Sequence, residues 1–387
     1  MNAAFVVIAG IIVLIYGWLN YLIGAHGWQT IFSHISFLPV WVYWLLFWLI
    51  ALAFILARFS EKFLPAVIYE WLSLIGAVWL AAFLYLVLIL IVLKILDLLN
   101  MWLHILPMGV RHSMAFTTGL GLTVFMLVTG ILVYGAWNAR HPRIHHYDIS
   151  IAKPAGTLSS LHVVMVSDIH LGTIVHNGQL LQMVERINEL QPDLVLLAGD
   201  VIDENIEPFI KQEMTTTFRQ LHTKYGVYAV LGNHEYIGGN AEEAIKYLDA
   251  AGVQVLRDQS VKVAGSFYLV GRDDRSGARF RGAKRQALNT LLLGLDRRLP
   301  VIVMDHQPLG LAEPESQGVD LQLSGHTHAG QLFPGRLITR RMFEDDWGYL
   351  RKGNFQLIVS SGYGTWGPPI RTGNYPEIVD ISLTFGK

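Results

Sequence analysis

The amino-acid sequence predicts a four-helix transmembrane region followed by an α/β domain, a β-sheet sandwich flanked by helices. Charge supports the division, because the 139 residues at the start contain only Arg58, Glu61, Lys62, Glu70, Lys94, Asp97 and Arg111 as charged residues. After residue 140, short apolar runs typical of strands alternate with amphipathic helical patterns. Short polar clusters follow several of these runs, which is typical of an α/β sheet with a site at one edge.

Four apolar stretches account for the first part of the chain. A helix that crosses a membrane needs about 20 mostly apolar residues, and the stretches 3–23, 38–59, 71–93 and 115–137 are long enough. The first has no basic residues before it and no clear small-residue cleavage site, so it is not typical of a cleaved signal peptide. We therefore expect a membrane-anchored protein with residues 1–139 as a four-span membrane domain; the alternative is a large buried helical core.

A basic connector leads into the second part. We expect residues 140–157 to be a juxtamembrane linker and residues 158–387 to be one α/β domain, a common length for a single unit of this class. The net charge of −1 and the lack of a concentrated basic patch argue against nucleic-acid binding. The sequence contains no cysteine, which excludes disulfides and thiolate metal ligands.

Strands and helices alternate along the second domain. The main strands are expected at 163–166, 194–197, 227–231, 301–304 and 321–323, with shorter ones at 253–256, 261–264 and 267–270. Helices are expected at 180–190, 207–222 and 241–251. The stretch 355–383 is rich in glycine and proline and has strand-like ends. Because strands dominate the second half of the domain, we expect packed sheets rather than a doubly wound sheet.

Five polar clusters occur in a fixed order after expected strands. They are Asp168-Ile169-His170, Gly199-Asp200, Gly232-Asn233-His234-Glu235, His306 and Gly325-His326-Thr327-His328. Residues just past the carboxyl ends of neighbouring strands converge on one crevice in an α/β sheet. Seven side chains with oxygen or nitrogen donors would meet there, enough for two metal ions. A pair of metal ions is suited to cleaving phosphoester bonds.

The order of these clusters resembles the calcineurin-like metallophosphoesterase superfamily. The resemblance covers essentially the whole second domain, and no cluster carries a substitution at a ligand position. The segments Asp305-His306-Gln307-Pro308 and Thr365-Trp366-Gly367-Pro368-Pro369 are similar to a bacterial branch that often carries membrane or export segments. The membrane part has no counterpart in the superfamily's motifs, so the resemblance does not address its role.

The resemblance implies a dinuclear metal centre. One ion would be held by Asp168, His170, Asp200 and His328, and the other by Asp200, Asn233, His306 and His326. It also implies that His234 protonates the leaving oxygen or stabilises charge on phosphorus, and that Asp203 orients His234. Mixed oxygen and nitrogen ligands suit manganese, which we expect, and also iron or zinc.

Several of these residues have ordinary alternatives. Asp200 and Asp203 could cap a helix that follows a strand, and His326 and His328 could be solvated loop histidines. Asp273-Asp274 follows another strand, where turn chemistry and a role in the site are both open.

The sequence therefore predicts a membrane-anchored phosphoesterase that uses two divalent metal ions. Its substrate would be a phosphodiester, phosphomonoester or pyrophosphate, either soluble or lipid-linked. The alternative is a catalytically silent membrane sensor or scaffold, but degeneration normally removes a ligand and none is missing here. We expect a multi-pass protein of the cell membrane. Lys and Arg near the span ends favour a cytoplasmic phosphoesterase domain, with five on its side (Arg58, Lys62, Arg140, Arg143 and Lys153) against two opposite (Lys94 and Arg111).

Overall fold

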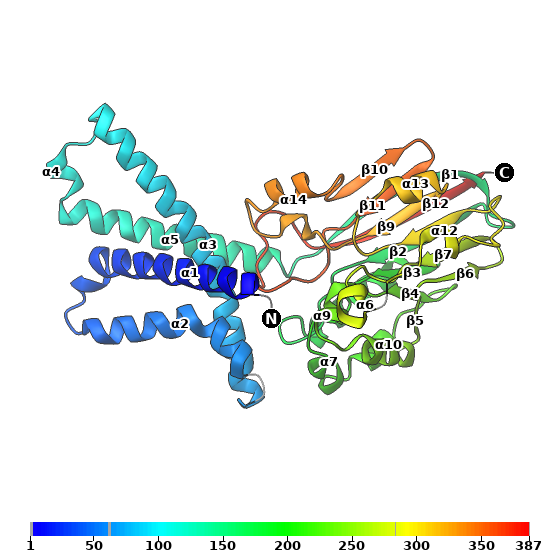
Figure 1. Ribbon diagram of the computed structural model, residues 1–387, viewed down its shortest axis with the longest axis horizontal. Helices are drawn as coiled ribbons and strands as arrows, with labels where there is room; N and C mark the ends of the chain where they lie inside the picture. Colours follow the sequence, from blue (N-terminus) through cyan, green and yellow to red (C-terminus); the bar gives the residue numbers. More distant parts are fainter. Residues whose placement is uncertain (1–2, 61–62, 283, 387) are drawn as a thin grey trace. The chain divides into compact units, whose positions relative to one another are not determined.

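A computed structural model describes residues 3–60, 63–282 and 284–386 (Figure 1). The chain forms two compact units: the first ends at Gly135 and also includes Gly367–Pro369, and the second contains the other residues from Ala136 onward. Residues 1, 2, 61, 62, 283 and 387 lie outside the described residues. They include Lys62, one of the basic residues counted near the span ends, the first residue of the expected membrane domain and the last residue of the expected α/β domain. Four apolar helices precede an α/β domain of two sheets, which confirms the predicted fold class.

Each of the four expected spans corresponds to a long helix. These helices are α1 (Ala3–Thr30), α2 (Val40–Ser60), α3 (Ala66–Leu103) and α5 (Met114–Asn138). All four contain a stretch long and apolar enough to cross a membrane. The short elements η1 (Phe32–His34) and α4 (Met108–Arg111) lie in the connections.

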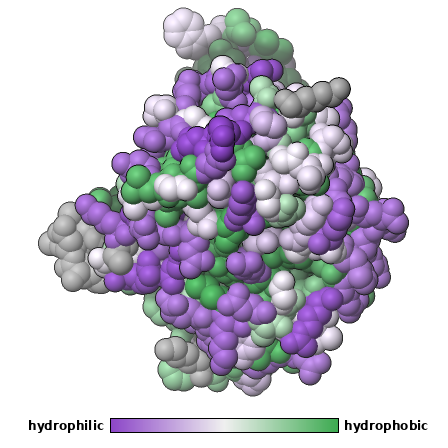
Figure 2. Space-filling view, turned by 90° about the vertical axis from the view of Figure 1, so that its right-hand side faces the viewer, coloured by the Kyte–Doolittle hydropathy of each residue, from purple (hydrophilic) through white to green (hydrophobic). Residues whose placement is uncertain are grey.

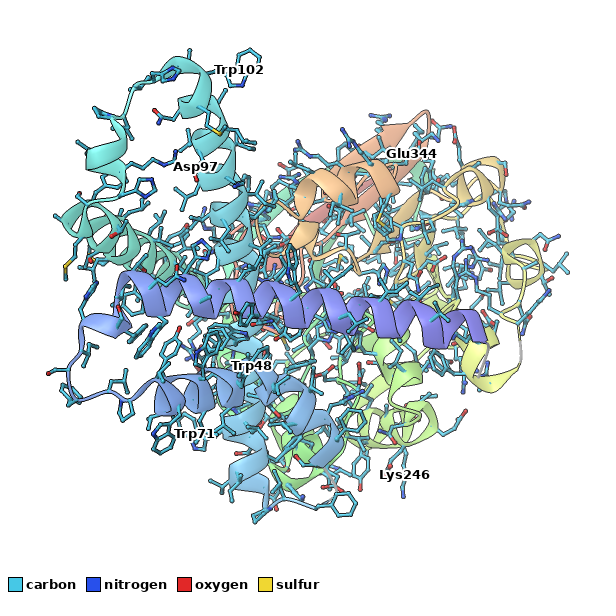
Figure 3. The ribbon with its side chains drawn as sticks, turned by 60° about the vertical axis from the view of Figure 1, so that its left-hand side comes forward. Trp48, Trp71, Asp97, Trp102, Lys246 and Glu344 are labelled. Carbon is cyan, nitrogen blue, oxygen red and sulfur yellow. The ribbon has the colours of Figure 1, made fainter. Side chains whose placement is uncertain are left out.

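The surfaces of these helices suit a lipid environment. Trp71 and Trp102 of α3 are 62% and 87% exposed, and Trp102 extends outward near the end of the helix (Figure 3). A side chain at Gly76 of α3 would overlap the backbone of Phe54, so a glycine there allows α2 and α3 to pack closely. The carboxylate of Asp97 lies 2.7 Å from Nη2 of Arg111, which neutralises both charges.

Two six-stranded sheets form the second unit. The first sheet contains, in spatial order, β1 (Arg143–Pro154), β12 (Glu377–Gly386), β2 (Ser160–Val166), β3 (Leu194–Ala198), β4 (Val227–Val230) and β5 (Val253–Val255). The second contains β10 (Gly348–Lys352), β11 (Phe355–Val359), β9 (Leu321–Ser324), β8 (Val301–Met304), β7 (Phe267–Gly271) and β6 (Gln259–Val263). Strands β2 to β5 are parallel, as are β7, β8, β9 and β11.

Helices cover the sheets and complete the sandwich. They are α6 (Asn177–Leu190), α7 (Glu207–Lys211), α8 (Met214–Phe218), α9 (Asn233–Ile237), α10 (Ala241–Ala250), α11 (Gly277–Arg281), α12 (Leu288–Leu291), α13 (Ala312–Ser316), η2 (His328–Gly330) and α14 (Arg336–Met342). Successive side chains of β2 point to opposite faces of the sheet and pack in two different hydrophobic cores. Val163 and Met165 pack between the sheets, whereas Val164 and Val166 pack with apolar residues of α6. Hydrophilic residues cover most of the face seen in Figure 2.

Two segments differ from the sequence prediction. Residues 143–154, expected in the linker, form β1, which pairs in parallel with β12. Ile149 and Ile151 are buried there at alternate positions, a pattern masked by the basic residues that precede them. The single helix expected at 207–222 is wrong. The chain instead forms α7 and α8, because Glu213 between them has a φ of 52°, a left-handed conformation that a continuous helix cannot include.

Candidate metal centre

The five polar clusters lie at the carboxyl ends of neighbouring strands. Asp168 follows β2, Asp200 follows β3 and Asn233 follows β4, while His306 and His326 follow β8 and β9 of the second sheet. Backbone hydrogen bonds join these loops: His170 N donates to Asp200 O at 3.0 Å, and Gly325 N donates to His306 O at 2.9 Å. The site is therefore built on the ends of both sheets.

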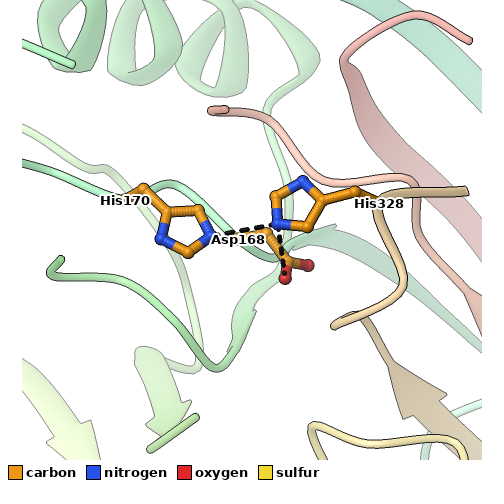
Figure 4. Close-up of side chains that lie close together, drawn as sticks. All are labelled: Asp168, His170 and His328. Carbon is orange, nitrogen blue, oxygen red and sulfur yellow. Dashed lines mark hydrogen bonds and ion pairs between the residues drawn. The ribbon is translucent and has the colours of Figure 1, made fainter. Parts of the chain in front are cut away.

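One group of possible metal ligands consists of Asp168, His170 and His328. One donor atom of each lies within 4.8 Å of the others. The Nε2 atoms of His170 and His328 are 3.0 Å apart, and Nε2 of His328 is 3.5 Å from Oδ1 of Asp168 (Figure 4). All three side chains are buried.

A second group consists of Asp200, His306 and His326, again with donor atoms within 4.8 Å. Nδ1 of His306 donates to the carbonyl of Ala198 at 2.8 Å, which leaves the lone pair on Nε2. That Nε2 atom lies 3.0 Å from Oδ2 of Asp200. An imidazole fixed in this tautomer, with its other nitrogen beside a carboxylate, is suited to binding a cation.

The residues present fit a pair of divalent metal ions. Within the described part of the chain, three buried atoms of the predicted ligands have no hydrogen-bond partner: Nδ1 of His170, Oδ1 of Asn233 and Nε2 of His306. Buried polar atoms normally have partners. Carboxylate, carboxamide and imidazole donors are those that hard or borderline divalent ions prefer.

The electrostatics of the site favour positive charge. Burial raises the pKa of Asp200, but the neighbouring His306 outweighs burial and holds this pKa well below its ordinary value. Burial lowers the pKa of His306, but the charge of Asp200 outweighs burial and holds this pKa well above its ordinary value, so the field of the carboxylate favours positive charge at the imidazole. Burial also lowers the pKa of His328, assisted by the charges of His170 and Arg371. His328 is therefore neutral, as a metal ligand must be.

Backbone conformation in the site is unusual. Five of the seven predicted ligands have a positive φ: Asp168, His170, Asp200, His326 and His328. Residues other than glycine rarely adopt it, and each instance costs about 1–3 kcal/mol. Such conformations concentrate at functional sites, where the surrounding structure maintains them.

Each motif glycine lies against a predicted ligand. A β-carbon at Gly199 would lie 2.5 Å from Nδ1 of His306, and one at Gly232 would overlap Oδ1 of Asp200. A β-carbon at Gly325 would overlap Oδ2 of Asp168. The glycines of the Gly-Asp, Gly-Asn-His-Glu and Gly-His-x-His clusters therefore make room for the carboxylate or imidazole of another cluster.

His234 lies beside these groups. Its Nδ1 is 3.1 Å from Oδ1 of Asp203, and its backbone N–H donates to Oδ1 of Asp200 at 2.8 Å. Burial lowers the pKa of His234, but the carboxylates of Asp203, Asp200 and Glu204 outweigh burial and raise it to about 9. Burial raises the pKa of Asp203, but the imidazoles of His170 and His234 outweigh it and lower this pKa. All nine residues singled out from the sequence thus lie in one region.

Some residues near the site were not identified from the sequence. Arg371 is fully buried and donates to the carbonyls of Ser361 at 2.9 Å and Gly362 at 3.1 Å. Asn374 donates to the carbonyl of His328, and the two side chains together brace the loop that carries this ligand. In the sequence, Arg371 and Asn374 stand out only as two polar residues in a stretch rich in glycine and proline.

The carboxylates of Asp273 and Asp274, which follow β7, are bound by neighbouring side chains. Asp273 accepts a hydrogen bond from the hydroxyl of Tyr236 and lies 2.7 Å from Nη2 of Arg281. Asp274 accepts from Nε2 of Gln307 at 2.9 Å. Asp274 therefore supports the loop after His306, whereas Asp273 joins Tyr236 of α9 to Arg281 of α11.

An α/β sandwich with carboxylate, carboxamide and imidazole donors gathered at its strand ends defines a metal-dependent hydrolase. Residues 161–330 match the sequence model of the family described as calcineurin-like phosphoesterase. An uncharacterized metallophosphoesterase of Aquifex aeolicus (strain VF5) is 34% identical over 246 residues, which cover 62% of this chain and 91% of that protein. The chain belongs to this family of metallophosphoesterases and is a phosphoester hydrolase, as the sequence predicted.

The chain is also similar to two proteins of Danio rerio. A protein of Danio rerio described as a transmembrane protein with metallophosphoesterase domain is 29% identical over 326 residues, 81% of this chain and 74% of that protein. Among solved structures, a dimetal phosphatase from Danio rerio gives a TM-score of 0.33 at 13% identity, covering 58% of this chain and 98% of that chain. The first alignment is long enough to include part of the apolar region.

Proposed function

We propose that the chain hydrolyses its phosphoester substrate at a dinuclear centre. One ion would be held by Asp168, His170, Asp200 and His328, and the other by Asp200, Asn233, His306 and His326. The observation that carries this proposal is the convergence of two donor groups from the ends of both sheets, with three buried donor atoms that lack hydrogen-bond partners. Asp200 is the shared ligand in this arrangement.

The side chains around the centre have separable tasks. Divalent ions bound there, for which we propose manganese, would polarise a phosphoryl oxygen and lower the pKa of an attacking water. Because Nδ1 of His234 is engaged by Asp203, the proton available for transfer is on Nε2. A pKa of about 9 keeps this ring protonated near neutral pH, as donation to a leaving oxygen requires. Asp203 acts by orienting that ring.

We propose an amphiphilic phosphoester as the substrate, because four apolar helices are covalently joined to the hydrolase domain. Purified full-length protein with added manganese should be assayed on phosphomonoesters, phosphodiesters and nucleotide-lipid pyrophosphates. Faster hydrolysis of the lipid-linked members than of their water-soluble counterparts is expected. No turnover of any member, by protein that retains its metal, would support the silent sensor or scaffold.

Chelation is expected to abolish activity. All seven proposed ligands carry oxygen or nitrogen donors, so a strong chelator should remove about two ions per chain and manganese should restore the rate. Elemental analysis before and after chelation measures both quantities. An active, untreated preparation that contains no transition metal would refute the dinuclear centre.

We also propose that the hydrolase domain faces the cytoplasm. Four spans place the amino terminus and the domain on the same side, and Lys and Arg near the span ends number five on that side and two opposite. A green-fluorescent protein fused to the carboxyl terminus is expected to fluoresce, and alkaline phosphatase fused there is expected to be inactive in intact cells. The reverse pair of results would place the domain outside.

A further inference from the structure

Helix α14 and the segment just before it carry exposed apolar side chains. Phe333, Leu337, Ile338 and Met342 are 60%, 62%, 62% and 65% exposed, respectively. Isolated apolar residues are common on protein surfaces, but several large ones within ten residues commonly mark a contact with another body. Within the described chain, each of these four residues keeps more than half of its surface exposed.

A single cation lies within this apolar face. At 100° per residue, Arg341 falls between Leu337 and Ile338 around the helix, and Met342 follows Ile338 by one turn. The other two arginines of α14 approach Asp346: Nε of Arg336 lies 3.6 Å and Nε of Arg340 lies 4.0 Å from its carboxylate. Arg341 is exposed and has no ion-pair partner among the described residues.

The same surface adjoins the metal centre. Helix α14 packs against η2, which begins at the proposed ligand His328. The ring of Phe343, the residue after α14, lies 5.9 Å from the ring of His326, another proposed ligand. Helix α14 therefore lies beside two proposed ligands.

We propose that Phe333, Leu337, Ile338, Arg341 and Met342, the α14 patch, insert into the interfacial layer of a lipid bilayer with anionic headgroups. An apolar face with an embedded arginine matches such a layer, because its long side chain reaches the phosphates while its neighbours enter the acyl region. Symmetric pairing with a second copy would bring two Arg341 side chains together in an apolar contact, which is unfavourable.

The covalent structure makes a bilayer accessible to the patch. Helix α5, which is long and apolar enough to span, ends at Asn138, and β1 begins at Arg143. The four residues between them extend about 3.5 Å each at most, so the domain stays tethered near the bilayer surface. Insertion of the patch requires no catalytic turnover, so it can be tested whether or not the proposed ligand set is correct.

The test uses full-length protein in vesicles of phosphatidylcholine and phosphatidylglycerol. Because the chain has no cysteine, Ile338→Cys can carry a single environment-sensitive fluorophore. Leu293→Cys is the matched control, since Leu293 is an apolar residue 76% exposed outside the patch. Lys246→Cys is a polar control, and Lys246 points outward from the domain (Figure 3). Lipids brominated in their acyl chains are expected to quench the probe at 338 several-fold more than at either control position.

Arg341→Glu, introduced into the Ile338→Cys protein, tests whether the positive charge of Arg341 contributes to binding of anionic headgroups. It is expected to reduce quenching several-fold in vesicles that contain phosphatidylglycerol, and much less in pure phosphatidylcholine. Equal quenching at 338 and at the control positions, or none at 338, would overturn the proposal. A blue-shifted probe that brominated lipid does not quench would identify a protein occupant, such as a second copy, and would overturn it as well.

Discussion

Asp200→Ala is expected to abolish turnover and to remove more metal than substitution of any other single ligand. Asp200 is 2% exposed, and its Oδ2 lies 3.0 Å from Nε2 of His306. Its Oδ1 accepts the backbone N–H of His234. Because one carboxylate would serve both ions, we expect a loss in kcat of more than ~10⁴-fold, the scale seen when one member of a catalytic unit is removed. Elemental analysis should find fewer than one ion per chain.

Two further variants separate the metal from the fold. Asp200→Asn keeps an oxygen for the N–H of His234 but loses the charge, so it should retain the structure and still lose metal. Asp249→Ala removes an exposed carboxylate from α10 and should keep both metal and activity. Retention of two ions by a folded Asp200→Ala protein would show that Asp200 is not the shared ligand.

The features that could be predicted from the sequence are those determined by a few consecutive residues. The apolar runs 194–197 and 301–304 lie within β3 and β8, because a buried parallel strand is recognisable from a few consecutive residues. The polar residues after each run identified the site, since strand ends of one sheet edge must converge. The close packing of the glycines in three of the clusters was not predictable, because the ligand that each accommodates comes from a different cluster.

Features that depend on distant partners were not predictable. Strand β1 is stabilised by pairing with β12, more than 200 residues further along the chain, so its segment was interpreted as a linker. Arg371 donates to the backbone carbonyls of Ser361 and Gly362 and to Asn374, which in turn donates to the carbonyl of His328. Every residue has a backbone carbonyl, so the sequence does not reveal which carbonyls are bound. Whether Asp273 serves the metal centre or a support network depended on Tyr236 and Arg281, which only the folded chain brings to it.

His234→Ala is expected to lower kcat by about 10²–10⁴-fold, the usual contribution of a general acid or base, while both ions remain bound. His234 could act as a proton donor or as a metal ligand, because donor atoms of His170, Asp203 and His234 lie within 4.8 Å of one another and could hold an ion. The hydrogen bond from Nδ1 of His234 to Asp203 favours the proton donor. Elemental analysis of the purified variant, beside its steady-state kinetics, measures both quantities.

Asp203→Asn is the companion variant. It keeps an oxygen at hydrogen-bond distance from Nδ1 of His234 but removes the charge that helps to hold the imidazole protonated. We therefore expect a smaller loss in kcat than in His234→Ala, with KM and metal content unchanged. In the double variant the two losses should not add, because Asp203 would act only through His234. Loss of an ion from either single variant would instead make the pair ligands, and additive losses would give Asp203 a task of its own.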